Sequence, residues 1–188
     1  MKKVKFLLTL SLIISSSVLF AQMYVVNTAN SIIEWEGKKV TGQHNGTIAI
    51  KSASLDMHDN HLHGGNFVVD MTSIVCLDIE NEKYNKKLVG HLESDDFFSV
   101  ETYPTATLKI TDDAIFKNGK AKVMGELTIK GKTLPIEFDA HKADGKITAK
   151  IVVDRSKYDV RYGSKSFFDN LGDKMIYDDF TLNVTLAF

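Results

Sequence analysis

The sequence predicts a mainly β protein: an antiparallel, lipocalin-like barrel of about eight strands with one short helix and a C-terminal lid-like segment. Apolar and polar residues alternate along most of the chain, and hairpin-type dipeptides separate the alternating segments. Helical periodicity is confined to one short stretch. Alternation at every second residue is typical of a strand with one buried face, and about eight such strands can close into a barrel that is filled by side chains or holds one small ligand.

The first 21 residues are interpreted as a secretory signal peptide. A positively charged start precedes an apolar run from Phe6 to Phe20, and Ala21 follows, which is the order of regions in a signal peptide. This run is shorter than the roughly 20 apolar residues of a membrane-spanning helix. We therefore expect cleavage near Ala21 and a single domain over residues 22–188, periplasmic or secreted, without a membrane span.

The charge balance and the cysteine content exclude some functions. Three of the 23 basic residues lie in the leader, whereas all 24 acidic residues follow it. Nucleic-acid binding and a polybasic membrane patch both need clustered positive charge, so the sequence argues against both. Cys76 is the only cysteine, which leaves no internal disulfide. We expect a buried, inert thiol, with intermolecular pairing as the alternative.

Three strands and a helix are predicted in the first half of the mature chain. The expected inward residues of the strands are Ile33, Trp35 and Gly37; Ile48 and Ile50; and Phe67, Val69 and Met71. Between residues 77 and 94, apolar residues recur at three- to five-residue spacing among charged ones. This spacing predicts one short amphipathic helix.

Five further strands are predicted in the second half. Their inward residues are Ala106, Leu108 and Ile110; Val123, Gly125, Leu127 and Ile129; Ile136, Phe138 and Ala140; Ile147, Ala149, Ile151 and Val153; and Phe180, Leu182, Val184 and Leu186. Asn118-Gly119 and Asp144-Gly145 are strong hairpin signals. The inward set is almost wholly uncharged and mixes bulky with small side chains, which leaves open both a solid core and a cavity.

Several blocks, in a consistent order, resemble one family. They are residues 24–27 with 31–35, residues 92–98 and 103–107, and, most specifically, residues 125–136 followed by 154–158. These blocks resemble the YceI-like periplasmic proteins, and the resemblance extends over nearly the whole mature chain. Asp159 stands where that family more often has glycine, and Lys130 where arginine is common. Residues 162–173 look like the lid-like segment of a subgroup.

The resemblance implies a barrel that binds a polyisoprenoid or another long-chain, fatty-acid-like lipid and needs no cofactor. It does not decide whether the protein forms a homodimer. Each buried CH₂ contributes about 0.8 kcal/mol, so affinity would come from chain length. The expected wall residues are Trp35, Phe67, Val69, Leu108, Leu127, Phe138 and Ile151. The pairs Phe97-Phe98 and Phe167-Phe168 are expected to close the barrel end or, alternatively, to pack loops onto the core.

A histidine segment carries the strongest competing signal. His61 and His63 share one face of an extended segment, and His58 can fold back towards them. Imidazoles so placed bind zinc or copper, but a fixed site needs further ligands, and a solvated polar turn is the default interpretation. An extracytoplasmic metal-binding protein using His58, His61 and His63 is the second hypothesis, and a ligand-free interaction module with a filled barrel is the third.

Signals for catalysis are weak, and we interpret the chain as a protein that is not an enzyme. Asp95-Asp96 is typical of a helix cap or turn rather than of a catalytic carboxylate pair. Cys76 has no obvious histidine partner, and the chain carries no recognisable phosphate-binding glycine loop. Asp154-Arg155 ends an apolar strand, and a structural ion pair there is favoured over contact with a ligand head group.

Overall fold

The computed structural model describes residues 23–188; the expected signal peptide and its cleavage site lie outside the described residues. Ten strands and one α-helix follow one another in this part of the chain. They are β1 (Met23–Val25), β2 (Ile32–Lys39), β3 (Gly42–His58), β4 (His61–Cys76), α1 (Glu82–Glu93), β5 (Thr105–Ile110), β6 (Ala114–Ile115), β7 (Lys120–Ile129), β8 (Lys132–Ala143), β9 (Lys146–Asp154) and β10 (Ile176–Ala187). Three short 3₁₀ helices cover Thr28–Asn30, Arg155–Tyr158 and Gly172–Lys174.

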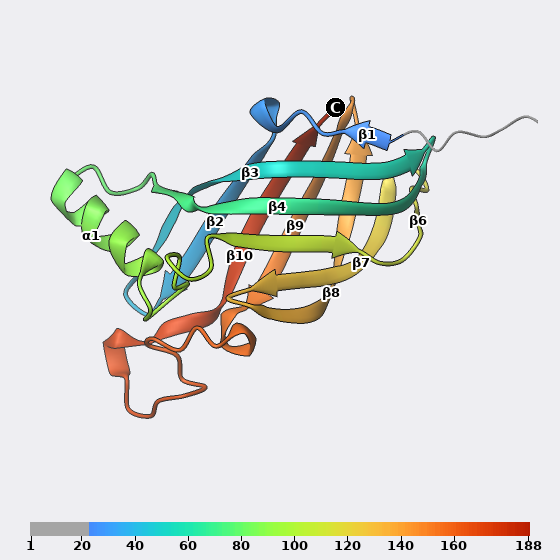
Figure 1. The fold of residues 1–188 in the computed structure, drawn as a ribbon. Coiled ribbons are helices and arrows are strands. Elements are labelled where there is room, and N and C mark those ends of the chain that lie inside the picture. Colours follow the sequence, from blue (N-terminus) through green and yellow to red (C-terminus); the bar gives the residue numbers. More distant parts are fainter. Residues whose placement is uncertain (1–22) are drawn as a thin grey trace, which may run out of the picture.

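Eight of these strands close into an antiparallel barrel, which confirms the predicted fold class. Their order is β3-β2-β10-β9-β8-β7-β5-β4, and β4 pairs back with β3 to complete the circle. β1 adds to β3, and β6 adds to β4, at one end of the barrel (Figure 1). Closure pairs both sides of each of the eight strands, so none of them is left as an open edge.

The predicted hairpin dipeptides lie at the turns between strands. Both residues have positive φ in Asn118-Gly119 (51° and 74°) and in Asp144-Gly145 (51° and 70°). This is the type I′ conformation, whose twist matches that of the paired strands. Glycine at the second position adopts this conformation without the steric cost of a Cβ atom. The two dipeptides therefore form the tight turns that directly precede β7 and β9.

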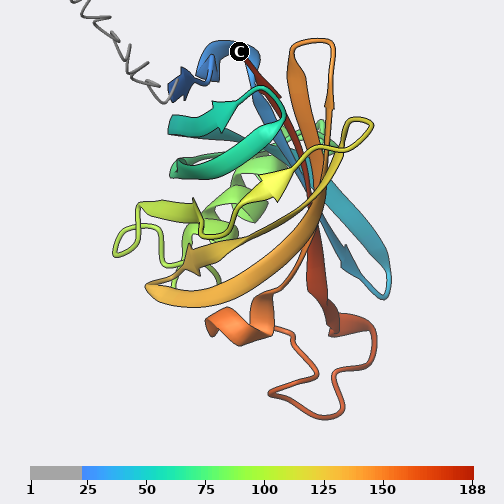
Figure 2. The same cartoon turned by 90° about the vertical axis from the view of Figure 1, so that its right-hand side faces the viewer.

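The two ends of the barrel differ. At the end that carries β1 and β6, a cluster of buried side chains fills the interior, with Met57, Leu62, Phe116 and Val123 among its members. At the other end, α1 and residues 155–175 lie outside the barrel strands (Figures 1 and 2). We call this second end the helix end.

The predicted helix is confirmed as α1. Asn81 caps it by accepting a hydrogen bond from the backbone N–H of Tyr84, a typical use of asparagine at this position. Leu88 and Leu92 face the barrel interior, whereas Tyr84 is 62% exposed. Among the described residues, no helix has the length and apolar character that a membrane span requires.

Candidate functional site

The barrel encloses a cavity of about 260 Å³. All eight barrel strands contribute to its lining, as do Leu88 and Leu92 of α1 and Phe97 and Phe98 in the following loop. The lining is apolar apart from a few polar or charged side chains, most of which lie at the helix end. Such a surface can retain an apolar molecule but offers few hydrogen bonds to a polar one.

Several inward-facing side chains show that the interior is not solid. Phe138, Leu182 and Val184 point into a closed barrel, yet they are only partly buried. All three line the cavity, which accounts for the surface they leave accessible. A close-packed core would bury such residues completely. The sequence left open whether the barrel has a solid core or a cavity, and the structure contains a cavity.

The predicted wall residues come together around this cavity. All seven predicted wall residues line the cavity: Trp35, Phe67, Val69, Leu108, Leu127, Phe138 and Ile151. Phe97 and Phe98 also line it, whereas Phe167 and Phe168 lie outside the lining and are 40% and 50% exposed. The guanidinium of Arg161 stands 5.0 Å from the ring centre of Phe167. Contact of the lining residues with a ligand stays a prediction.

The cavity reaches the surface at the helix end. Lys38 and Lys39 at the end of β2 line it, together with Ile176 and Tyr177 at the start of β10. The side chain of Lys38 is 54% exposed and Tyr177 is 47% exposed. We call these four residues the mouth. A ligand that enters here meets lysine side chains first and apolar walls beyond them.

Small residues create part of the space inside. Ala149 of β9 lines the cavity between Ala140 of β8 and Val184 of β10, which are its partners across the sheet. Gly37 lines the cavity too, and a Cβ atom added there would have no heavy atom within 4 Å. The wall therefore has room for a larger side chain at Ala149 in β9 and at Gly37 in β2.

Arg155 lies beside the mouth but uses its N–H groups within the protein. They donate to the backbone carbonyl oxygens of Val160 at 2.9 Å and of Ile176 and Tyr177 at 3.1 Å. Burial lowers the pKa of this guanidinium, and the carboxylate of Asp178, 3.6 Å away, partly offsets the effect. Arg155 therefore forms a structural ion pair, but with Asp178 and not with the neighbouring Asp154 that the sequence suggested. Asp154 instead accepts hydrogen bonds from the backbone and hydroxyl of Ser156.

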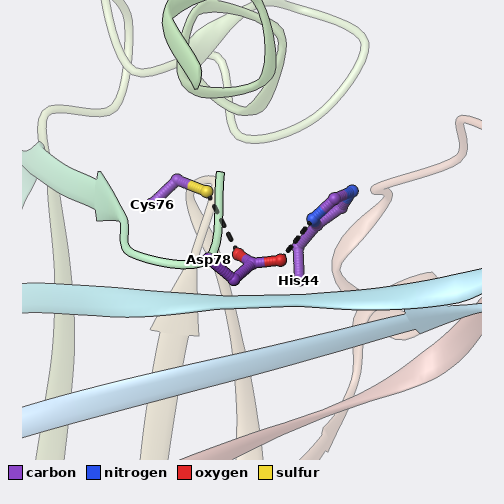
Figure 3. A group of neighbouring side chains, drawn as sticks. All are labelled: His44, Cys76 and Asp78. Atoms are coloured by element: carbon purple, nitrogen blue, oxygen red, sulfur yellow. Dashed lines mark hydrogen bonds and ion pairs between the residues drawn. The ribbon is translucent and has the colours of Figure 1, made fainter. Parts of the chain in front are cut away.

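A polar cluster adjoins the cavity at the helix end. It consists of His44 in β3, Cys76 at the end of β4 and Asp78 in the linker to α1 (Figure 3). Asp78 Oδ2 lies 2.8 Å from Nδ1 of His44, and Oδ1 accepts a hydrogen bond of 3.2 Å from the Cys76 thiol. His44 also lines the cavity. The carboxylate thus lies between the ring and the sulfur.

The protonation of this cluster does not favour a nucleophile. Cys76 is 3% exposed, and burial raises the pKa of its thiol, as does the Asp78 hydrogen bond. Burial alone would raise the pKa of Asp78, but hydrogen bonds from Asn45, His44 and Cys76 outweigh it and hold that pKa below its ordinary value. Nucleophilic cysteines need a thiolate with a histidine or another positive group beside them, whereas this thiol donates to a carboxylate.

A close approach of β3 to β4 brings the cluster together. Gly46 is paired with Cys76, and a Cβ atom at Gly46 would lie 1.7 Å from the carbonyl oxygen of Val75. The indole N–H of Trp35 donates to the same carbonyl at 3.2 Å. Only glycine permits this approach, which places His44, two residues earlier, beside the end of β4.

The predicted histidine segment lies at the opposite end of the barrel. His61 Nε2 and His63 Nδ1 are 3.3 and 3.4 Å from Oδ2 of Asp113. His58 is not part of this group and pairs with Asp59 at 3.2 Å. Two of the three proposed ligands therefore meet, around a carboxylate that lies 50 residues further along the chain and that the sequence did not single out.

The fold and the chain resemble known proteins. The crystal structure of BcnA from Burkholderia cenocepacia aligns with a TM-score of 0.68 at 22% identity, over 87% of this chain and 99% of that one. A polyisoprenoid-binding domain from Saccharophagus degradans aligns with a TM-score of 0.58 at 13% identity, over 86% and 95%. At these identities the likeness establishes a shared fold.

Sequence comparison adds a family. A UPF0312 protein of Vibrio parahaemolyticus is 39% identical over 75 residues, which are 40% of this chain and 36% of that protein. The match thus spans little more than a third of this relative. The model of the YceI-like domain, in contrast, matches residues 24–188. Because that match covers nearly all of the described residues, the protein belongs to the YceI-like family.

Proposed function

We propose that the protein binds one apolar, chain-like molecule, a polyisoprenoid or another long-chain lipid, inside the barrel and carries or sequesters it. The observation that carries this proposal is the cavity of about 260 Å³, with its apolar wall and its mouth at the helix end. The family and a structural neighbour described as a polyisoprenoid-binding domain support it. In this proposal the protein acts by binding alone and is not an enzyme.

The size of the cavity bounds the bound part of the ligand. An apolar cavity of roughly 150 Å³ holds one benzene molecule, six carbon atoms. On the same scale, a cavity of about 260 Å³ holds roughly ten carbon atoms. These correspond to two isoprene units or a ten-carbon acyl segment. The remainder of a longer chain, with its head group, would extend through the mouth.

The mouth supports one orientation of the ligand. Lys38 and Lys39 lie at the rim, while apolar side chains such as Phe116 and Leu62 line the far end of the cavity. Lysine keeps its ammonium group in water while its methylene stem covers apolar surface. We therefore expect the hydrocarbon tail to enter first and a polar or anionic head group to stay near the two lysines.

The gross binding energy follows from the same count. Burial contributes about 0.8 kcal/mol per CH₂, so roughly ten carbons contribute about 8 kcal/mol. Association costs at least about 4 kcal/mol in lost freedom, which leaves a modest net affinity unless head-group contacts add to it. Retention of the ligand would then depend strongly on how completely the cavity is filled.

We also propose that the protein acts outside the cytoplasm, after cleavage near Ala21. The positive start and the apolar run of the leader support this location. Fractionation of the producing cells, followed by mass measurement of the isolated protein, tests it. A mature mass that begins within a few residues of Ala21 is expected, and an uncleaved cytoplasmic protein would contradict the proposal.

Equilibrium competition tests the binding function. Solvent-extracted, refolded protein is loaded with an environment-sensitive apolar fluorophore, which is then displaced by isoprenoid alcohols and fatty acids. One-to-one, saturable displacement by compounds of ten or more carbons is expected, with no displacement by nucleotides or sugars. If none of the isoprenoid or fatty-acyl compounds is taken up, the proposed function is wrong.

A further inference from the structure

The cluster of His44, Cys76 and Asp78 is more polar than the holding of an apolar chain requires, and it combines three metal-ligating groups. One candidate ligand atom from each residue lies within 4.8 Å of the other two (Figure 3). We propose that this cluster is a binding site for a thiophilic divalent cation of the Zn²⁺ type. The ligands would be the Cys76 sulfur, the His44 imidazole and a carboxylate oxygen of Asp78.

The distances in the cluster are close to those of a tetrahedral site. Zinc lies about 2.3 Å from sulfur and about 2.0–2.2 Å from nitrogen and oxygen, which places neighbouring ligand atoms roughly 3.4–3.6 Å apart. In the structure, the carboxylate oxygens lie 2.8 Å from the His44 nitrogen and 3.2 Å from the Cys76 sulfur. These two contacts involve different oxygens of Asp78, and a ring nitrogen of His44 lies within 4.8 Å of the Cys76 sulfur. To share one cation, the two contacts with Asp78 would open by roughly half an ångström, and the nitrogen and sulfur would approach each other by up to roughly 1.3 Å. Rotation of the side chains can provide both movements.

Neighbouring hydrogen bonds from β3 and from α1 hold the ligands in place. The backbone N–H of Asn45 donates to Asp78 Oδ1 at 3.0 Å, and its carbonyl accepts from Leu77 at 2.9 Å. The side-chain amide of Asn85 in α1 donates to the carbonyl of Cys76 at 2.9 Å. The linker therefore arrives already fixed against the start of β3, and such supporting contacts orient metal ligands.

The donor set selects among cations. Thiolate and imidazole favour zinc and similar metals, whereas magnesium and calcium prefer sites built from oxygen alone. Three protein ligands leave a fourth tetrahedral position open. On binding, the cation takes the place of the thiol proton, which passes to solvent, while the neutral imidazole of His44 and the carboxylate of Asp78 donate electron pairs.

A cation here would cross-link the rim of the cavity. His44 lines the cavity, and the linker that contains Asp78 leads into α1, whose Leu88 and Leu92 line it as well. We therefore expect the bound cation to slow exchange of the apolar ligand. That consequence rests on the proposed function; cation binding itself does not, and it is measured on protein without lipid.

The second histidine cluster provides an internal comparison. His61, His63 and Asp113 also place ligand atoms within 4.8 Å of one another, but they include no sulfur. Their side chains are 40%, 40% and 60% exposed. Cys76 is the only cysteine of the chain, so a thiolate-to-metal signal can come from the cluster at the helix end alone.

Cobalt titration of lipid-free protein tests the proposal. Co²⁺ added to the His61→Gln/His63→Gln variant should bind one ion per protein, with a thiolate-to-cobalt charge-transfer band and the visible spectrum of tetrahedral cobalt. Zn²⁺ should displace it. Cys76→Ser should abolish the band. His44→Gln should weaken binding by about 10–100-fold or more, because substitutions of residues that only support the ligands already cost that much.

Circular dichroism of each variant confirms that it is folded. His44→Gln serves as the safer variant, since its side chain is 34% exposed whereas Cys76 is buried. Absence of a charge-transfer band in the folded His61→Gln/His63→Gln variant would overturn the proposal. Cobalt affinity that is unchanged in folded His44→Gln would overturn it as well.

Discussion

Replacing Ala149 by phenylalanine fills the cavity and should abolish binding. Ala149 lines the cavity between Ala140 and Val184, and the change adds six ring carbons. A group of that size takes up roughly 150 Å³ of a cavity of about 260 Å³. Room for about four ligand carbons remains. The loss of six buried carbons at about 0.8 kcal/mol each amounts to roughly 5 kcal/mol, more than a thousandfold in affinity.

The same substitution should not harm the fold. A ring placed in existing space gains burial, so the ligand-free Ala149→Phe protein is expected to be more stable by about 1.5–3 kcal/mol. Val152→Phe is the matched control, because Val152 lies on the same strand but is 54% exposed. It should leave both binding and stability close to those of the wild type.

Two assays measure these effects. Competition with an apolar fluorophore gives the affinity for a ten-carbon isoprenoid alcohol, and denaturant unfolding of lipid-free protein gives the free energy of unfolding. Wild-type affinity in folded Ala149→Phe would refute the placement of the ligand. A loss of stability of about 2 kcal/mol or more, as overpacking causes, would show that the space is not there.

Three further predictions follow from particular distances and volumes. In a series of straight-chain alcohols, affinity should rise roughly fourfold per added CH₂ and level off near ten carbons; a continued rise well beyond that length would mean that the cavity is larger in solution. Gly46→Ala should lower the free energy of unfolding by about 3 kcal/mol, because the new Cβ atom would lie 1.7 Å from the Val75 carbonyl oxygen. Gly37→Ala is the control: its Cβ atom would have no heavy atom within 4 Å, so the same denaturant assay should show almost no change. Equal effects of the two substitutions would contradict the close approach of β3 and β4. The hydroxyl and backbone N–H of Thr72 donate to Asp70 and hold the pKa of its carboxyl below the ordinary value. This carboxylate therefore stabilises the folded protein above the pKa that Asp70 has in the unfolded chain, and the contribution is lost as pH falls through the folded pKa. NMR titration should show the pKa of Asp70 rising in Thr72→Val, and an unchanged pKa would exclude the hydroxyl as the main cause of the lowering.

The barrel could be predicted because its second half keeps strict alternation. In β7 every second residue from Ala121 to Ile129 is buried, as the period-2 pattern requires. β3 is less regular: its register against β4 shifts between Thr47 and Ala49 and again between Ile50 and Ser52. These irregularities break the alternation, which is why the pattern gave no signal for β3 beyond Ile50. The two-residue strand β6 is too short for periodicity to detect.

The cavity wall could be predicted, but the cavity itself could not. Alternation identifies Phe67 and Phe138 as inward-facing, yet the same alternation describes a solid core and a hollow one. The volume depends on how small residues such as Ala149 meet across the closed barrel. Likewise, Phe97-Phe98 and Phe167-Phe168 are similar as sequence, and only the course of the loops shows that the first pair lines the cavity and the second does not.

The polar clusters depend on contacts between distant residues. His44 and Cys76 are brought together by the pairing of β3 with β4, and Asp113 reaches His61 and His63 through the loop before β6. The sequence singled out Cys76, His61 and His63 separately. Nothing in their spacing indicates the register that joins them, so neither carboxylate partner could be identified.

Native mass spectrometry of the protein, isolated from its own cells without detergent, tests the central claim most directly. The proposal predicts one apolar chain molecule bound per protein, removed by solvent extraction, restored by added isoprenoid or fatty-acyl compounds, and absent from the folded Ala149→Phe variant. A wild-type protein that carries no such molecule and takes up none of the added compounds would contradict it.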